Sequence, residues 1–361
     1  MSRELHAIVL AAGEGSRMRS SLPKPLHRLC GRPMILHVID ALAELDVQRV
    51  VVVVGHGGDQ VTKTVSELAP EGLRVEFVEQ VVQRGTGDAA AVALSAFSSV
   101  EDDDDVVVLP GDTPLLRPAT LAELVARHRD REAGVTLLTA ELDDPTGYGR
   151  IVRGKDGRVS GIVEHGDATQ QEREIHEVNT SIYCFRRALL APALRRLGSS
   201  NAQGEHYLTD VVGVLYEAGY PTHSLTVVDS MEAAGVNDRA QLSVAEAELR
   251  DRINERWMRR GVTMWDPERT YVDTDVELGK DVTLLPGTVL RGKCRIAEGC
   301  RIGPNAMLED TTMGERAVVG TVHALHATIG SGAFVESFVT LAPSVVVAES
   351  SRIAAFQSLA P

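Results

Sequence analysis

The C-terminal third of the chain carries an aliphatic residue at every sixth position. The period breaks between residues 311 and 326 and then resumes. Gly, Pro, Asn and Asp cluster between the repeated positions, as tight turns require. A period of six fits neither an α-helix nor a coiled coil, and it predicts a parallel β-helix in which each short face contributes one interior side chain. The repeated residues are Leu278, Leu284, Leu290, Ile296, Ile302 and Leu308, followed by Ile329, Val335, Leu341, Val347 and Ile353.

Two of the four cysteines fall within this repeat. Cys294 and Cys300 are one repeat apart, and each precedes a repeated isoleucine by two residues. We therefore expect them to be stacked interior residues rather than metal ligands or a disulfide. With Cys30 and Cys184 they form no Cys-x-x-Cys pair, so disulfides are not required and a reducing cytoplasm is favoured.

The first two thirds of the chain alternate short apolar runs with helical patterns. Apolar runs such as that at 50–54 suit strands that are covered on both faces, and the alternation predicts a mostly parallel, doubly wound, Rossmann-like α/β sheet. Ligands in such sheets bind beyond the carboxyl ends of the strands. Expected strands lie at 7–10, 50–54, 74–78, 106–109 and 135–139, with helices at 34–45, 59–68, 88–97 and 118–129.

A further helix is expected at 238–260, ended by Gly261. It would connect a domain at 1–237 to the β-helix at 262–361 through a linker at 238–261, although a surface helix of the first domain fits the same pattern. A chain of 361 residues agrees with two domains. One face of the helix carries Leu242, Ala245, Leu249, Ile253 and Trp257.

Composition restricts the possible partners. The net charge of -14 argues against binding to nucleic acid or to an anionic membrane surface. No apolar run approaches the length of a membrane span, and no secretory signal precedes the first strand. The acidic run at 101–105 is expected to be a solvated loop.

The loop after the first strand has the composition of a phosphate site. The sequence L-A-A-G-E-G-S-R-M occupies 10–18, and Pro23-Lys24 follows. Small residues let backbone N–H groups approach an anion, a helix beginning after them would add its positive end, and Arg17 and Lys24 supply full charge. The loop is neither a Walker A motif, which ends in Gly-Lys-Ser/Thr, nor a dinucleotide fingerprint, which needs a third glycine. It therefore predicts a triphosphate site.

Read as a whole, the chain resembles the bacterial bifunctional N-acetylglucosamine-1-phosphate uridylyltransferase/glucosamine-1-phosphate acetyltransferase family. The resemblance covers the whole domain at 1–237 and weakens within the repeats. It implies a sugar-1-phosphate nucleotidyltransferase domain followed by a short left-handed β-helix. The matching segments are 10–24, 37–40, 55–58, 85–87, 143–150, 162–165, 177–180, 201–205 and 235–237.

The resemblance implies a role for each matching residue. Arg17 and Lys24 would be catalytic, and Asp112 and Asn237 would bind Mg²⁺ as carboxylate and amide ligands. From the residues themselves, Asp112 could equally be a turn or cap residue and Asn237 a helix N-cap. The nucleotide would contact Leu10, Ala11, Ala12, Gly13, Lys24, Gln80, Gln83, Gly85, Thr86, Gly111 and Asp112, and the sugar Gly149, Glu164, Asn179, Thr180 and Asn237.

Within this set, Gln80, Gln83, Gly85 and Thr86 match the segment that reads uracil. Side-chain amides can satisfy the donor and acceptor edge of a pyrimidine, and Gly85 would admit the ring. Asp88 stands where many relatives carry histidine, so it brings a negative charge close to this segment.

The implied reaction joins UTP and N-acetylglucosamine 1-phosphate into UDP-N-acetylglucosamine and pyrophosphate, a precursor step for peptidoglycan and lipopolysaccharide. Two alternatives stay open: another sugar phosphate or nucleotide such as glucose 1-phosphate or dTTP, and a catalytically silent nucleotide-sugar-binding regulatory subunit.

The acetyltransferase half is expected to be inactive. Leu341-Ala342-Pro343 stands where the family carries Leu-Arg-Pro, and the later histidine and Asn-Tyr-Asp-Gly-like motifs are not found before residue 361. The chain would be a monofunctional uridylyltransferase or a shortened piece of the bifunctional enzyme. About three coils of β-helix are expected, and they would assemble a homotrimer, as in relatives.

Overall fold

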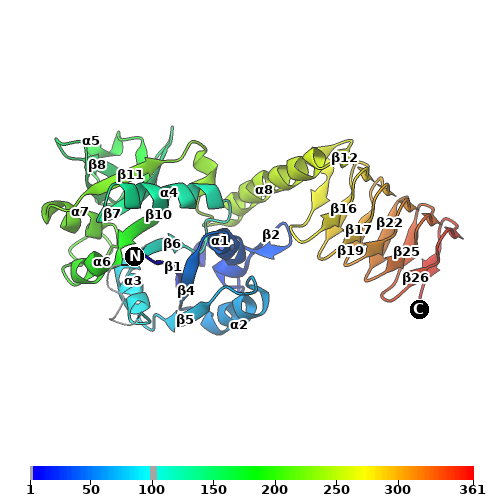
Figure 1. The fold of residues 1–361 in the computed structure, drawn as a ribbon, viewed down its shortest axis with the longest axis horizontal. Helices are drawn as coiled ribbons and strands as arrows, with labels where there is room; N and C mark the ends of the chain where they lie inside the picture. Colours follow the sequence, from blue (N-terminus) through cyan, green and yellow to red (C-terminus); the bar gives the residue numbers. More distant parts are fainter. Residues whose placement is uncertain (1–2, 98–103) are drawn as a thin grey trace. The chain divides into compact units, whose positions relative to one another are not determined.

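The computed structural model describes residues 3–97 and 104–361. Its internal contacts divide the chain into two compact units (Figure 1). Unit 1 comprises Met1–His27 and Pro33–Leu242, and unit 2 comprises Arg28–Arg32 and Ser243–Pro361. The division falls within the predicted linker helix, and the domain boundaries at 237/238 and 261/262 stay a prediction.

Unit 1 is built on a mixed sheet whose centre is parallel. β1 (Leu5–Ala11) lies between β4 (Val47–Val54) and β6 (Asp105–Pro110), and it is parallel to both. All five predicted strands form, each longer than or shifted by no more than a residue from its expected range. The order is β11 (Thr222–Thr226), β7 (Val135–Glu141), β10 (Glu177–Arg186), β6, β1, β4 and β5 (Val75–Glu79), with β8 (Arg150–Arg153) and β9 (Val159–Val163) joined to β10 through β8.

β10 is the departure from a parallel sheet. It runs antiparallel to both β6 and β7, so the sheet is mostly but not wholly parallel, as predicted. Its register with β7 shifts between Asn179 and Ile182, and Ser181 has a φ of 62° within the shift. Such a bulge bends the strand and redirects its side chains.

Helices cover both faces of the sheet, which confirms the doubly wound prediction (Figure 1). Alternate residues of β1 enter different cores: Ala7 and Val9 pack with α1, α2 and α4, whereas Ile8 packs with α3, α6 and α7. This follows from the two-residue period of a strand with both faces buried. The helices are α1 (Met34–Ala43), α2 (Gly58–Leu68), α3 (Thr86–Leu94), α4 (Pro118–Asp130), α5 (Gln170–Arg173), α6 (Arg187–Leu194) and α7 (Asp210–Glu217), with short 3-10 turns η1 (Ser16–Met18), η2 (Lys24–Leu26) and η3 (Ser230–Ala233).

Unit 2 is a parallel β-helix built from three sheets. Each hexapeptide strand pairs with the strand one coil away: Leu278 with Ile296, Ile302 with Val319, and Ile329 with Val347. Every repeated aliphatic residue is buried, except Ile353, which is half-buried. The sheets are β12-β15-β18-β21-β24-β27, β13-β16-β19-β22-β25-β28 and β14-β17-β20-β23-β26.

These strands are short and follow one another closely. β13 is preceded by the turn η4 (Pro267–Arg269), and a two-stranded ladder, β2 (Arg28–Leu29) with β3 (Arg32–Pro33), lies earlier in the chain. The bounds are β12 Thr263–Met264, β13 Tyr271–Val272, β14 Glu277–Leu278, β15 Thr283–Leu284, β16 Val289–Arg291, β17 Arg295–Ile296, β18 Arg301–Ile302, β19 Met307–Glu309, β20 Thr312–Met313, β21 Val318–Val319, β22 Val322–Leu325, β23 Thr328–Ile329, β24 Phe334–Val335, β25 Val339–Leu341, β26 Val346–Val347, β27 Arg352–Ile353 and β28 Ser358–Leu359.

The break in the period is not a break in the β-helix. Met313, Val319 and Ala324 fill the interior there, so three faces are five residues long instead of six: 308 to 313, 319 to 324 and 324 to 329. A coil accordingly shortens from 18 residues (278 to 296) to 16 (308 to 324) and returns to 18 (329 to 347). The expectation of about three coils was wrong, since two of the sheets hold six strands each.

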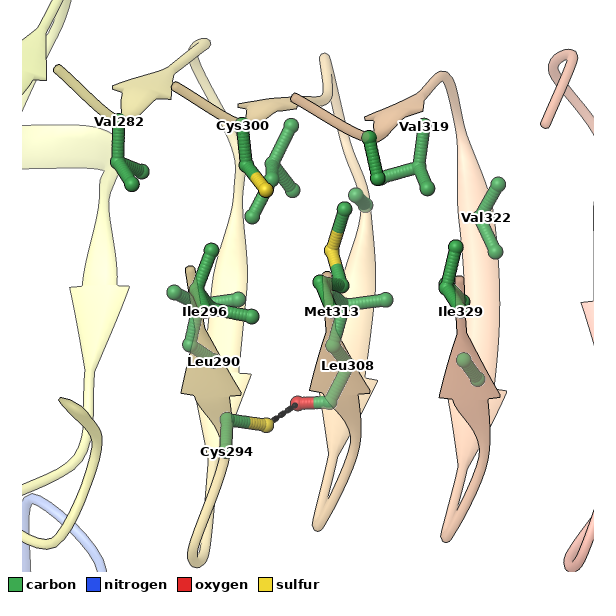
Figure 2. Packing of buried hydrophobic residues seen from close by; sticks show 14 of the residues in the cluster. Val282, Leu290, Cys294, Ile296, Cys300, Leu308, Met313, Val319, Val322 and Ile329 are labelled. Carbon is green, nitrogen blue, oxygen red and sulfur yellow. Dashed lines mark hydrogen bonds between the residues drawn. The ribbon is translucent and has the colours of Figure 1, made fainter. Parts of the chain in front are cut away.

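The interior of the β-helix is aliphatic with two sulfurs. Figure 2 shows side chains of successive coils stacked along it, with the Cys294 thiol donating to the Leu308 carbonyl at 3.4 Å. Cys300 is buried in the same way, and its thiol donates to Gly314 O at 3.0 Å. The four cysteines are free and buried, and burial raises the pKa of the Cys294 thiol to about 11, which suits packing rather than reactivity.

The long helix α8 (Arg239–Arg259) forms as predicted, one residue shorter at each end. Ala245, Ile253 and Trp257 are buried, and Leu249 packs against the β-helix core together with Ile253 and Trp257. Within unit 2 the helix thus covers the first coils. Among the described residues no helix is both long and apolar enough to span a bilayer.

The prediction that the acidic run is solvated was wrong at Asp104 and Asp105. Residues 101–103 lie outside the described residues, but Asp104 and Asp105 are buried. Asp105 begins β6 and accepts a hydrogen bond from Arg129 Nε at 2.8 Å, with His128 Nε2 at 3.4 Å. Arg129 and Arg3, whose Nε lies 3.6 Å from Asp105 Oδ1, compensate its charge in place of water.

Candidate active site

A cleft of unit 1 opens at the carboxyl ends of β1 and β6, where the topology predicts a ligand. Every predicted nucleotide, sugar and metal residue lines it. The cleft also holds residues that sequence reasoning did not assign, among them Ser181, Glu205 and Gln241. The predicted residues found in its wall are Leu10, Ala11, Ala12, Gly13, Arg17, Lys24, Gln80, Gln83, Gly85, Thr86, Gly111, Asp112, Gly149, Glu164, Asn179, Thr180 and Asn237.

The predicted phosphate loop begins after β1, which ends at Ala11, and packs against Lys24. Gly15 has a φ of 64°, and a Cβ there would lie 2.6 Å from Lys24 Cβ, so only glycine lets the two segments meet. A Cβ on Gly13 would meet nothing, which leaves open space beside the backbone.

The expected helix after this loop does not form. Only the single turn η1 (Ser16–Met18) follows, between Gly15 and Arg19, which are both left-handed. One turn carries no substantial dipole, so the positive charge here comes from the side chains of Arg17 and Lys24.

Four polar groups converge at the centre of the cleft. Lys24 Nζ contacts Asp112 Oδ2 and donates to Asn237 Oδ1 at 2.8 Å, while Arg17 Nη2 donates to the same Asn237 oxygen at 3.0 Å. The Lys24 and Asp112 side chains are 14% and 22% exposed, so the pair is largely shielded but open to a ligand. Asp112 Oδ2 and Asn237 Oδ1 therefore both contact the Lys24 ammonium.

The backbone explains this convergence. Val236 N donates to Asp112 O at 2.9 Å, which holds the segment before α8 beside the end of β6. Asn237 N donates to Gln241 Oε1 at 2.7 Å. The N-cap alternative for Asn237 is wrong, because Asp238 caps α8 by accepting from Gln241 N at 2.8 Å.

The oxygens of Asp112 and Asn237 suit a divalent cation. A hard cation binds carboxylate and amide oxygens, and in this structure both oxygens already share one cation, the Lys24 ammonium. The donor set therefore fits the metal expected from the sequence.

The segment predicted to read the base lies between β5 and α3. Gln83 Nε2 donates to Ala12 O at 2.7 Å, and Gln80 Nε2 donates to Gly85 O at 3.1 Å. Gly85 has a φ of 103°, and a Cβ there would lie 2.6 Å from His206 O. Glycine is thus required by close packing against the backbone, a reason different from the room for a ring that the sequence suggested. Thr86 Oγ1 accepts from Leu208 N at 3.0 Å.

The residues predicted to bind the sugar lie on β10 and at the ends of β8 and β9. Asn179 Nδ2 donates to Tyr183 Oη at 2.8 Å, and Thr180 Oγ1 donates to Leu138 O at 2.7 Å. The bulge of β10 includes both residues, which explains why a strand interior presents polar groups to the cleft. A Cβ on Gly149 would lie 2.9 Å from Ile162 Cγ2, so this glycine is also required by packing.

Glu164 is a half-buried acid in the wall of the cleft. Burial raises the pKa of its carboxyl, and a hydrogen bond from Thr209 Oγ1 to Oε1, 3.1 Å long, opposes this. Thr209 was missed by sequence reasoning, since it is 45 residues from Glu164 and no motif joins them. Tyr148 lies in the wall, and burial followed by the Asp112 charge raises the pKa of its hydroxyl.

Comparison with known proteins places these units in families. The model of the MobA-like NTP transferase domain matches residues 7–212, and that of the bacterial transferase hexapeptide repeat matches 275–310. The chain is 47% identical to the bifunctional protein GlmU of Thermobifida fusca over 91% of its own length and 68% of that protein. It is 44% identical to the GlmU protein of Exiguobacterium sp. (98% and 76%) and 42% identical to that of Halalkalibacterium halodurans (97% and 75%).

Proposed function

We propose, from the premise that this chain belongs to the family of bifunctional GlmU proteins, that it forms UDP-N-acetylglucosamine and pyrophosphate from UTP and N-acetylglucosamine 1-phosphate. The chain is a nucleotidyltransferase by family. The observation that carries the specific proposal is the meeting of Arg17, Lys24, Asp112 and Asn237 in one cleft.

The reaction needs positioning and charge, not a protein nucleophile. A phosphate oxygen of N-acetylglucosamine 1-phosphate attacks the α-phosphorus of UTP, a new P–O bond forms, and the bond to the β-phosphate oxygen breaks as pyrophosphate leaves. Arg17 and Lys24 stabilise the negative charge that grows on the transferred and departing phosphates. The small residues after β1 let backbone N–H groups approach the triphosphate.

NTP transferases of this family use a divalent metal, and we propose Mg²⁺ held by Asp112 and Asn237. When bound, it would neutralise charge on the phosphates. The Lys24 ammonium contacts the same two oxygens, so binding of metal and nucleotide requires Lys24 to exchange the carboxylate for a phosphate.

The sugar is proposed to lie against Glu164, Asn179 and Thr180. Glu164 and Asn179 offer acceptor and donor groups for sugar hydroxyls and the acetamido group. Their presence favours N-acetylglucosamine 1-phosphate over glucose 1-phosphate. The catalytically silent alternative is disfavoured, because a binding module would not need both cations and both metal ligands.

Pyrophosphate release tests the proposal. The protein is incubated with UTP, Mg²⁺ and in turn N-acetylglucosamine 1-phosphate, glucose 1-phosphate and N-acetylgalactosamine 1-phosphate. We expect rapid release with the first compound, and loss of release on chelation of the metal. No release with any sugar phosphate, or a preference for glucose 1-phosphate, would refute it.

We also propose that the protein is a cytoplasmic homotrimer that supplies a precursor for peptidoglycan and lipopolysaccharide. The β-helix would form the contact between copies, and its exposed apolar side chains at Phe338, Val346 and Phe356 support an interface. Sedimentation equilibrium measures the mass of the assembly, and a monomer at micromolar concentration would contradict the trimer.

A further inference from the structure

The base-reading segment contains a contact that the reaction scheme does not use. Gln80 follows β5 directly and lies in the wall of the cleft, where the residue is 5% exposed. Gln80 Nε2 donates to Asp88 Oδ2 at 2.8 Å and to Gly85 O at 3.1 Å. Asp88 lies in the first turn of α3 and is half-buried.

These two contacts fix which way the Gln80 amide faces. A carboxylate and a backbone carbonyl are both acceptors, so only the NH₂ group of the amide can face them. Both of its hydrogens are then used, and the orientation follows from the chemistry of the partners rather than from the assignment of nitrogen and oxygen. Within residues 3–97 and 104–361, nothing donates a hydrogen bond to the remaining atom, Oε1.

We propose that Asp88 is a positioning residue that sets base preference by presenting the Gln80 carbonyl oxygen to the cleft. This inference depends on the proposed function of the cleft. An acceptor at this place pairs with the N3–H of uracil or thymine. Cytosine has a lone pair at N3, and an acceptor facing it is repelled.

Asp88 achieves this without contact with the nucleotide. If Asp88 is removed, Gly85 O still holds one hydrogen of the amide, but a single contact leaves the group free to turn. The charged hydrogen bond is the stronger of the two, as its shorter length indicates. Both Asp88 and Gly85 O are therefore needed to keep the Gln80 amide from turning its NH₂ group toward the cleft.

The test compares UTP with CTP in Asp88→Ala and Asp88→Asn. We expect the ratio of kcat/KM for UTP over CTP to fall about tenfold in Asp88→Ala, mainly through the KM of UTP, while the KM of the sugar phosphate stays unchanged. Asp88→Asn retains an acceptor oxygen and should keep most of the preference, which separates the hydrogen bond from the negative charge. If the negative charge of Asp88 were responsible instead, kcat/KM for UTP and kcat/KM for CTP would change by the same factor in both variants.

Two further variants exclude a merely structural role. Asp59→Ala removes an exposed aspartate from the first turn of α2, the equivalent place in another helix, and should leave the preference intact. In a Gln80→Ala background, the added Asp88→Ala change should have no further effect on the preference. An equal loss for both nucleotides, or an effect that persists without Gln80, would overturn the proposal.

Calorimetric binding of UTP and CTP to each variant gives the same comparison without turnover. If the wild-type protein releases no pyrophosphate but binds UTP with an Asp88-dependent preference, the proposed function fails and the role of Asp88 stands. If turnover is normal and the preference does not depend on Asp88, only this inference fails.

Discussion

Replacing Lys24 with methionine separates the two tasks proposed for its side chain. Methionine keeps the apolar stem that packs against Gly15 but removes the ammonium that contacts Asp112 and Asn237. Loss of one charge-stabilising donor costs about 3 kcal/mol of transition-state stabilisation, which corresponds to about a hundredfold in kcat. Arg17 still donates to Asn237 and would retain part of the activity.

The same substitution should strengthen metal binding. The Lys24 and Asp112 side chains are 14% and 22% exposed, and an ion pair of this kind is worth about 1 kcal/mol. Without the competing ammonium, Mn²⁺ used as a probe should bind about fivefold more tightly in the absence of nucleotide. The two effects have opposite signs, which a general loss of structure could not produce.

The assay couples pyrophosphate release at saturating UTP and sugar phosphate with Mn²⁺ titration by electron paramagnetic resonance. Lys63→Met, which removes an exposed cation from α2, is the matched control and should change neither quantity. Turnover by Lys24→Met equal to the wild type would exclude Lys24 from the mechanism. Slower turnover together with weaker Mn²⁺ binding would refute the competition between the ammonium and the metal.

Three other predictions concern stability, sugar binding and acetyl transfer. Asp105→Asn should lower the free energy of unfolding in urea by about 3 kcal/mol, because Arg3 and Arg129 lose a buried counter-charge. Burial opposes the charge of Asp105, but its hydrogen bonds with His128 and Arg129 hold the pKa of its carboxyl below the usual value. The difference in unfolding free energy between the wild type and Asp105→Asn should therefore be full above about pH 5. It should disappear as the pH falls through that lowered pKa. Glu164→Gln should raise the KM for the sugar phosphate about tenfold. It should also raise Tm more at pH 8 than at pH 4.5, because the pKa of Glu164 is raised and its charged form therefore lowers stability as the pH rises. An equal change of Tm at the two pH values would contradict this. Acetyl transfer from acetyl-CoA to glucosamine 1-phosphate should be undetectable by thiol release, because Ala342 offers no cation for the sugar phosphate, and measurable transfer would disprove this.

Features encoded by short-range patterns were predictable from the sequence. Each face of the β-helix needs one apolar interior residue, so Leu278 to Leu308 identify it without any long-range information. The valines of β4 likewise identify a strand buried on both faces. The six-residue period did not identify the interior residues at 311–326, because some faces there are five residues long. Their side chains still stack in the interior of the β-helix.

Features that depend on contacts distant in sequence were not predictable. The antiparallel insertion of β10 and its bulge at Ser181 are decided by pairing with β6 and β7, and the local sequence of β10 is compatible with either direction. Thr209 and Glu164 are joined only by the fold. Asn237 could be assigned to the site by resemblance, whereas its local sequence suggested a helix cap.

Asn237 shows why the site needs both kinds of information. Lys24 and Asn237 are 213 positions apart, and their contact depends on the backbone bond from Val236 to the end of β6. Asp238 takes over the capping of α8, which leaves the Asn237 amide free to face the two cations. Asp238→Ala should therefore destabilise the first turn of α8 by about 1 kcal/mol. It should also lower kcat/KM, because Asn237 would be misplaced. Hydrogen exchange at the first turn of α8, measured beside turnover, tests this, and faster exchange with unchanged kcat/KM would show that the cap does not position the amide.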